Sequence, residues 1–312
     1  MNALLFPGQG SQLVGMGSEF YNKFDLVKKI FQQADDKLKY PISKIILDGP
    51  EDKLQLTENT QPAILTVSYS IFTVMKNEFN IDLKFFKYVA GHSLGEYSAL
   101  VCSNSLSFDD ALYLLHERGK AMQSAVPVGQ GSMLAVLGLN IEDINEMIKD
   151  FKEGEICEIA NDNANGQVIV SGNKNCVESL KNSLKSKKIK SIPLKVSAPF
   201  HCSLMKPAAD YMGRKIRNTN FKDPLIEIIN NVTAKAEKKS DVIKDLLIDQ
   251  IFSTVKWRES LLYMSNNGIK NFLEIGPGKA LSGMTKRTIK SANCFSINSI
   301  DDMKNFHNEL QK

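Results

Sequence analysis

Short apolar runs alternate with longer amphipathic stretches along most of the 312-residue chain. A short apolar run bounded by glycine, proline or polar residues predicts a buried strand, and apolar residues repeating every three or four positions predict a helix. Strands are predicted at 3–6, 88–90, 225–229 and 269–274, and helices near 23–38, 60–79, 107–122, 204–216, 241–252 and 257–266. Because strands alternate with helices, we expect a mostly parallel sheet between layers of helices.

The pattern changes between residues 130 and 196. Here strands are predicted at 133–139, 156–160, 167–171 and 190–196, with helices at 141–151 and 175–186. The order β-α-β-β-α-β is typical of a ferredoxin-like unit. We therefore expect a small subdomain over residues 130–196, inserted in a larger α/β domain made of residues 1–129 and 197–312.

Two helix starts follow from capping chemistry. Ser107 and Asp110 form a capping box at the start of the helix over 107–122. Asn59 or Thr60 is expected to cap the helix near 60–79, with Pro62 in its first turn, where proline is favoured.

Composition and charge exclude several classes of protein. Hydrophobic residues make up 43% of the chain and charged residues 24%, as in ordinary globular proteins. The net charge of +4 with interspersed signs does not indicate nucleic-acid binding, although it permits weak attraction to an acidic partner. The glycine-rich segment at 7–12 matches neither a dinucleotide fingerprint nor a P-loop.

The cysteines and the hydropathy of the chain bear on the cellular compartment in which the protein is expected. The five cysteines are scattered, with no zinc-like spacing, which predicts reduced thiols and no metal site. No signal peptide precedes the first predicted strand, and no apolar stretch is long enough to span a membrane. We therefore expect a cytoplasmic protein that does not associate with membranes.

The segment Gly91-His92-Ser93-Leu94-Gly95 lies between a predicted strand and a predicted helix and matches the pattern G-x-S-x-G. In that motif the serine Oγ stands exposed at a sharp turn, beside helix N–H groups that favour a developing oxyanion. The alternative is a glycine-flanked turn with an unreactive serine, since short motifs also match by chance. The flanking strand and helix favour the nucleophile.

A serine nucleophile needs a base, and the chain has only four histidines. His201 lies between a strand and a helix, where α/β folds place site residues; the alternative is a histidine in a surface turn. His92 should point to the packed side of the bend, His116 lies within a helix, and His307 lies in a polar tail. No sequence argument identifies a triad acid, and a carboxylate, a backbone carbonyl or an amide could orient the imidazole.

Together these motifs resemble those of the malonyl-CoA:acyl carrier protein transacylases of fatty acid synthesis, over nearly the whole chain. The matching stretches are Phe6-Pro7-Gly8-Gln9-Gly10-Ser11-Gln12, Asn59-Thr60-Gln61-Pro62-Ala63, Gly91-His92-Ser93-Leu94-Gly95-Glu96-Tyr97, Arg118-Gly119-Lys120-Ala121-Met122-Gln123, Pro199-Phe200-His201 with Leu204-Met205-Lys206-Pro207-Ala208, and Glu274-Ile275-Gly276-Pro277-Gly278. Their shared order and spacing make the resemblance specific. It implies an α/β-hydrolase-like core with an inserted ferredoxin-like subdomain.

The resemblance also implies catalytic roles. Ser93 matches the acylated nucleophile and His201 the catalytic base. Gln250 matches the residue whose main-chain carbonyl steadies that histidine in place of an acid. The backbone N–H groups of Gln9 and Leu94 match the oxyanion hole.

For substrate binding, the resemblance implies that Arg118 grips the free carboxylate of the malonyl group. Asn161 matches a site-lining asparagine loosely, and Met122 is expected to be a further substrate-binding residue. Phe200 replaces a smaller residue found in many relatives, and in related domains phenylalanine there accompanies malonyl over methylmalonyl. No cofactor is implied; the partners are malonyl-CoA and the phosphopantetheine form of acyl carrier protein.

The activity implied is transfer of malonyl from coenzyme A to the carrier thiol through a malonyl-serine intermediate, with ping-pong kinetics. One alternative is a serine thioesterase or acyl hydrolase of the same fold. Another is a non-catalytic protein that only binds acyl carriers. The combination of Ser93, His201 and Arg118 disfavours both.

The main run of like charge is formed by Lys185, Lys187, Lys188 and Lys190. Such a run is usually a solvated edge. Because the carriers are usually acidic, the same lysines are also a candidate docking edge.

Overall fold

The computed structural model describes residues 1–149, 151–152, 154–196 and 198–310. Its larger part is built on a six-stranded sheet with the strand order β10-β9-β1-β2-β7-β8. The strands are β1 (Asn2–Phe6), β2 (Phe86–Gly91), β7 (Glu227–Ile229), β8 (Ala236–Glu237), β9 (Asn271–Ile275) and β10 (Asn293–Ile297). All neighbours are parallel except β7 and β8, which pair antiparallel.

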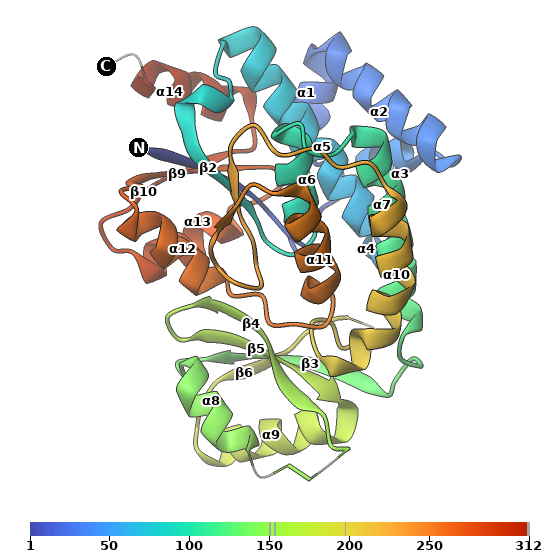
Figure 1. The fold of residues 1–312 in the computed structure, drawn as a ribbon, viewed down its shortest axis with the longest axis vertical. Coiled ribbons are helices and arrows are strands. Elements are labelled where there is room, and N and C mark those ends of the chain that lie inside the picture. Colours follow the sequence, from blue (N-terminus) through green and yellow to red (C-terminus); the bar gives the residue numbers. More distant parts are fainter. Residues whose placement is uncertain (150, 153, 197, 311–312) are drawn as a thin grey trace.

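Helices cover both faces of this sheet (Figure 1). One apolar core joins the sheet to α1 (Ser18–Lys23), α2 (Asp25–Leu38), α3 (Ile42–Asp48), α4 (Glu51–Gln55), α5 (Thr57–Phe79), α6 (Gly95–Cys102), α7 (Phe108–Ser124), α10 (Lys206–Asn218), α11 (Ser240–Gln250) and α14 (Ile300–Leu310). A second core on the opposite face joins it to α12 (Trp257–Asn266) and α13 (Ala280–Thr288). Two short 3-10 helices, η1 (Leu83–Phe85) and η2 (Ser203–Met205), complete this part.

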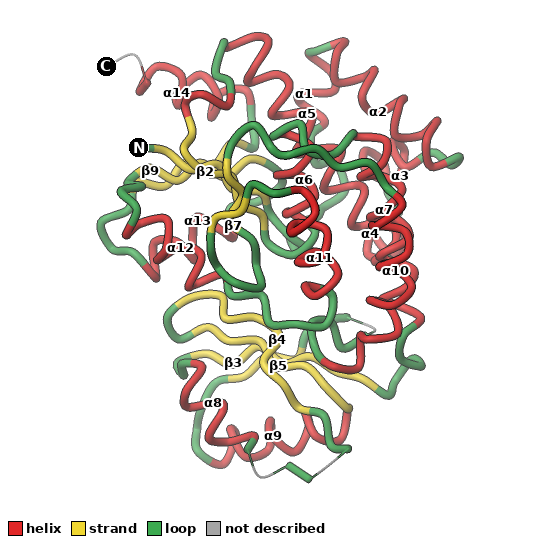
Figure 2. Tube along the Cα trace, viewed as in Figure 1, coloured by secondary structure: helices red, strands yellow, loops and turns green. Residues whose placement is uncertain are grey.

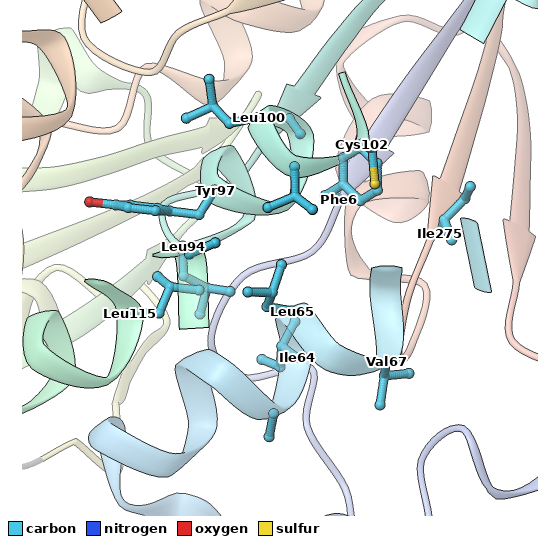
Figure 3. Packing of buried hydrophobic residues seen from close by; sticks show 14 of the residues in the cluster. Phe6, Ile64, Leu65, Val67, Leu94, Tyr97, Leu100, Cys102, Leu115 and Ile275 are labelled. Atoms are coloured by element: carbon cyan, nitrogen blue, oxygen red, sulfur yellow. The ribbon is translucent and has the colours of Figure 1, made fainter. Parts of the chain in front are cut away.

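The central strand β1 shows how one sequence serves both cores. Its side chains alternate between faces, so Leu4 and Phe6 enter the first core while Ala3 and Leu5 enter the second. In the first core, Phe6 shares the cluster with Leu65 from α5 and Leu94 beside α6 (Figure 3). A strand buried on both faces explains why this run is continuously apolar.

The smaller part is a four-stranded antiparallel sheet with the order β4-β5-β3-β6. Its elements are β3 (Gly131–Leu137), α8 (Ile141–Ile148), β4 (Cys157–Ala164), β5 (Gln167–Asn173), α9 (Lys174–Ser186) and β6 (Ser191–Pro193). Helices α8 and α9 pack on the face of this sheet that is turned away from the larger part (Figure 2). The predicted mixed α/β fold with a ferredoxin-like insert is confirmed.

The start of helix α5 differs from the prediction. Helix α5 begins at Thr57, so Pro62 lies in the second turn rather than the first. Proline has no N–H to offer the carbonyl four residues earlier. That carbonyl, on Glu58, instead accepts a hydrogen bond from Nδ1 of His116 at 3.0 Å, which gives this histidine its structural role.

The edge strand β4 joins the two parts. The Val255 N–H donates to the Ala160 carbonyl at 2.8 Å, and the Asp162 N–H donates to the Val255 carbonyl at 3.0 Å. Arg258 forms an ion pair with the buried Asp162 carboxylate at 2.9 Å. The small sheet is therefore held beside the carboxyl ends of β1 and β2, where the candidate site lies.

Candidate active site

Ser93 occupies a strained bend between β2 and α6. Its φ of 52° lies in the left-handed region, which is uncommon for a residue with a side chain. The bend is tight, since a Cβ added at Gly91 would lie 1.9 Å from the backbone of Gly95. A Cβ at Gly95 would lie 2.3 Å from the carbonyl oxygen of Phe6. Glycine is therefore required on both sides of this serine.

His201 faces Ser93 from a turn between β6 and η2, and it too has a left-handed backbone, with φ 58°. Its Nε2 lies 2.8 Å from Ser93 Oγ, and its Nδ1 lies 2.8 Å from the Gln250 carbonyl oxygen. Because a carbonyl only accepts, Nδ1 must carry the proton. Nε2 is then the basic nitrogen and accepts from the Ser93 hydroxyl.

The surroundings keep the His201 imidazole neutral. Burial, together with the positive charge of Arg118, lowers its pKa to about 3. Ser93 and His201 are 8% and 5% exposed, so the pair sits almost entirely out of water. A neutral imidazole hydrogen-bonded to a hydroxyl is the state needed in a general base.

Arg118 reaches the same point from α7. Its Nη2 donates to Ser93 Oγ at 3.1 Å and to the Gln250 side-chain oxygen at 2.8 Å, and its Nη1 donates to the Gln61 side-chain oxygen at 2.8 Å. Gly119, the next residue, lets α7 pack closely against α5, because a Cβ at this position would lie 2.5 Å from the Glu58 Cα.

The Arg118 guanidinium is a buried cation, with only 1% of the residue exposed, and burial lowers its pKa. No carboxylate within the described ranges forms an ion pair with it, and its Nε–H has no partner there. A rigid fork of donors beside the Ser93 hydroxyl is suited to bind a carboxylate on the acyl group.

The backbone N–H groups around Ser93 differ in whether they have a hydrogen-bond acceptor. The Ser93 N–H donates to Asn231 Oδ1 at 2.7 Å, and the Gly95 N–H donates to the His92 carbonyl at 2.9 Å. Between them, the Leu94 N–H has no hydrogen-bond acceptor among the described residues, and the Gln9 N–H likewise has none there. Such unengaged donors can stabilise an oxyanion.

The Gln9 loop lies against the bend. A Cβ on Gly8 would come within 2.7 Å of the His92 carbonyl oxygen, so this glycine permits the close approach. The His92 side chain points away from Ser93: its Nε2 lies 2.8 Å from Asn163 Oδ1, and its ring packs edge-on against Trp257.

The remaining predicted residues lie around this centre. Met122 is buried, and its sulfur accepts from Gln61, the partner of Arg118, at 4.0 Å. Asn161 forms a β-bridge with Val255, and Phe200 is buried directly before His201. No hydrogen bond within the described part of the chain connects Asn161 or Phe200 to Ser93.

Sequence reasoning assigned no role to three buried polar residues of the cluster: Gln61, Glu96 and Asn231. Gln61 and Glu96 stand inside the matching stretches, whereas no motif marks Asn231. The Gln250 side chain was also missed, although its main chain was predicted. All four act through partners distant in sequence, which no local pattern reveals.

A groove of about 540 Å³ reaches His201 from the seam between β4 and residues 252–256. Within the ranges that the structure describes, no group of three metal-ligating side chains could hold an ion. None of the helices described there is long and apolar enough to cross a bilayer.

Comparison with known proteins gives a consistent picture. Residues 3–311 match the acyl transferase domain family. Malonyl CoA-acyl carrier protein transacylase of Haemophilus influenzae is 42% identical over 299 residues, covering 96% of this chain and 95% of the relative. The relative of that name from Bacillus subtilis is 42% identical over 287 residues, with 91% and 89% covered.

Solved structures agree with these relatives. An acyl-carrier-protein S-malonyltransferase from Bartonella henselae superposes with a TM-score of 0.96 at 39% identity, covering 100% of this chain and 99% of the other. A malonyl-transacylase in complex with its type II PKS acyl-carrier protein superposes with a TM-score of 0.95 at 37% identity, covering 99% of each chain.

Proposed function

The chain belongs to the acyl transferase domain family, among its malonyl-CoA:acyl carrier protein transacylases, and we propose that it carries the malonyl group on Ser93. It is an acyltransferase that moves malonyl from malonyl-CoA to acyl carrier protein. The observation that carries the Ser93 assignment is the hydrogen-bonded chain from its hydroxyl through His201 to the Gln250 carbonyl, with Arg118 3.1 Å from the same hydroxyl.

In the first half-reaction, Ser93 Oγ attacks the thioester carbonyl carbon while His201 Nε2 takes the hydroxyl proton. The N–H groups of Leu94 and Gln9 bind the oxyanion of the tetrahedral intermediate. When the intermediate collapses, the C–S bond breaks and His201 returns the proton to the departing sulfur of coenzyme A. The malonyl group is left as an ester of Ser93.

In the second half-reaction, the phosphopantetheine thiol of the carrier gives its proton to His201 and attacks the ester. The C–O bond to Ser93 then breaks, and the serine oxygen recovers the proton. Because coenzyme A leaves before the carrier reacts, the kinetics are ping-pong. The pantetheine arm belongs to the carrier, so this chain needs no cofactor of its own.

Arg118 supplies selectivity for a diacid half-ester. Charge-assisted hydrogen bonds are about twice as strong as neutral ones, so a malonyl carboxylate gains strongly from the guanidinium fork. An acetyl group would leave the buried fork unpaired, which is a stronger form of discrimination than pocket size. Met122, Asn161 and Phe200 complete the proposed acyl-binding residues, with the contact between Met122 and Gln61 as support.

The domain boundaries and location are part of the proposal. We assign residues 1–129 and 197–312 to the catalytic domain and 130–196 to the small subdomain, supported by their separate sheets. We place the protein in the cytoplasm, supported by five cysteines that form no disulfide.

The test is the mass of the intact protein after exposure to malonyl-CoA, with the adduct mapped by peptide. We expect one malonyl group on Ser93 and none in Ser93→Ala. Addition of holo-carrier should discharge the adduct onto the carrier thiol. Free malonate released as fast as coenzyme A would indicate the hydrolase instead, and an adduct elsewhere would refute the Ser93 assignment.

A further inference from the structure

Glu96 is a buried carboxylate for which the mechanism above has no use. It stands in the first turn of α6 and is 2% exposed. Its Oε2 accepts hydrogen bonds from the Gln250 Nε2 and from the Asn231 N–H, the latter at 3.2 Å. Burial of an ionisable group without an ion pair is costly, and burial raises the pKa of Glu96 to about 7. Because burying this carboxyl group costs stability, a function of Glu96 would explain why it is present.

The bond from Gln250 determines which way that amide faces. Its Nε2, which carries two hydrogens, lies within hydrogen-bond distance of three acceptors: Glu96 Oε2, the Ser93 carbonyl at 3.1 Å and Asn231 Oδ1 at 3.2 Å. Its Oε1 accepts from Arg118 Nη2 at 2.8 Å. A flipped amide would turn its oxygen toward the carboxylate and its NH₂ toward the guanidinium, and both contacts would be repulsive. In its ionised form the Glu96 carboxylate only accepts, as does the Ser93 carbonyl, so both favour the observed orientation of the amide.

The bond from the Asn231 N–H connects Glu96 to the residue that braces the Ser93 bend. Asn231 accepts from the Ser93 N–H at 2.7 Å and donates to the Gly91 carbonyl at 2.8 Å. One side chain thus spans both sides of the bend that carries Ser93. Glu96 holds Asn231 by its backbone and Gln250 by its side chain, so a single carboxylate joins the bend to the arginine site.

We propose that Glu96 is a positioning residue for malonyl recognition, which holds the Gln250 amide with its oxygen toward Arg118 and so keeps the guanidinium aimed at the acyl carboxylate. This inference rests on the proposed function, because it assigns Glu96 to the same reaction. It differs from a general structural role in one respect: loss of Glu96 should harm malonyl transfer more than acetyl transfer.

The experiment compares acyl-enzyme formation from malonyl-CoA and from acetyl-CoA in the wild type, Glu96→Ala and Glu96→Gln. In Glu96→Ala we expect the malonyl rate constant to fall by about 10- to 100-fold, the loss from misaligning one charge-assisted hydrogen bond. The acetyl rate constant should fall by less than about 5-fold, because acetyl makes no bond to the fork. Glu96→Gln should restore malonyl transfer to within about 5-fold, since an amide oxygen can accept both bonds.

A matched control is Glu274→Gln. Glu274 is also a buried carboxylate, but it accepts from the Leu281 and Ser282 N–H groups at the start of α13. We expect this variant to lose stability without changing the ratio of malonyl to acetyl rates. Should Glu96→Ala not fold, Glu96→Asp withdraws the carboxylate by one methylene group and carries the same comparison.

The double variant with Arg118→Ala tests the route of the effect. If Glu96 acts through Arg118, its removal should no longer change the malonyl-to-acetyl ratio once the arginine is absent. Equal losses for both acyl groups in Glu96→Ala, or no rescue by Glu96→Gln, would overturn the proposal. A wild type that forms no malonyl-enzyme would instead refute the proposed role of Ser93, so the two failures are distinguishable.

Discussion

Replacement of Arg118 by alanine is the sharpest test of how this site selects its acyl group. The side chain is 1% exposed and donates three hydrogen bonds, to Gln61, Ser93 and Gln250. None of these partners is a carboxylate, so the fork can turn to a malonyl carboxylate without breaking an ion pair. Removing the guanidinium deletes a cation that lies 3.1 Å from the Ser93 hydroxyl oxygen.

The expected magnitude follows from the bonds that would be lost. A carboxylate bound by two charge-assisted hydrogen bonds gains about 1.5–3 kcal/mol from each, or about 3–6 kcal/mol together. At about 1.4 kcal/mol for each factor of ten, Arg118→Ala should lower kcat/KM for malonyl-CoA by about 10²–10⁴-fold. Acetyl-CoA has no carboxylate to lose, so its rate constant should change by less than about tenfold.

The assay measures second-order rate constants of acyl-enzyme formation by rapid quench and intact mass. Arg118→Lys should give an intermediate loss, because lysine keeps the charge but not the planar fork. Lys120→Ala, on the same helix and with its side chain about half exposed, is the matched control and should leave both rates unchanged. A folded Arg118→Ala protein with the wild-type malonyl-to-acetyl ratio would refute the carboxylate role.

Further predictions concern the base, the bend and the carrier surface. His201→Ala should slow acylation by about 10²–10⁴-fold with the fold intact, and wild-type acylation by mass spectrometry would remove this residue from the site. Because the pKa of His201 is lowered to about 3, protonation of this base should not reduce the acylation rate between pH 8 and pH 5. A fall in the pH–rate profile with an apparent pKa near 6.5 would contradict this. In the unfolded chain the pKa of this histidine is about 6.5. His201 therefore stabilises the fold fully above that pH, and this contribution is lost as the pH falls toward 3. The free energy of unfolding in urea should fall more steeply with decreasing pH in the wild type than in His201→Ala. Gly91→Ala places a Cβ 1.9 Å from backbone atoms and should cost more than about 4 kcal/mol, so an unchanged Tm would argue against the tight bend. Lys185→Glu with Lys188→Glu should slow transfer to an acidic carrier but not acylation by malonyl-CoA; transfer that is insensitive to both salt and charge reversal would dismiss this docking edge.

Much of the architecture could be predicted from the sequence because it depends on neighbouring residues. Alternating apolar runs and helical repeats identified four strands of the main sheet, β1, β2, β7 and β9, and the ferredoxin-like order of the insert. The strand–glycine–helix bend around Ser93 was readable because its tightness requires glycine on both sides. The helices α1, α3, α4, α13 and α14 and the strands β8 and β10 were not predicted, and they lie outside the recognised motifs.

The hydrogen bonding of the site was settled only by tertiary packing. Ser93 and His201 are 108 positions apart, and Arg118 and Gln250 are 132 apart, so no local pattern constrains their distances. The tautomer of His201 follows from a carbonyl at the end of α11, and the burial of Glu96 from helices that pack around it. Sequence alone determined which side chains were available and how the backbone turns at Ser93, since both are properties of adjacent residues. Which atoms meet, and how little water reaches them, was decided when distant helices closed over the sheet and lowered the local dielectric.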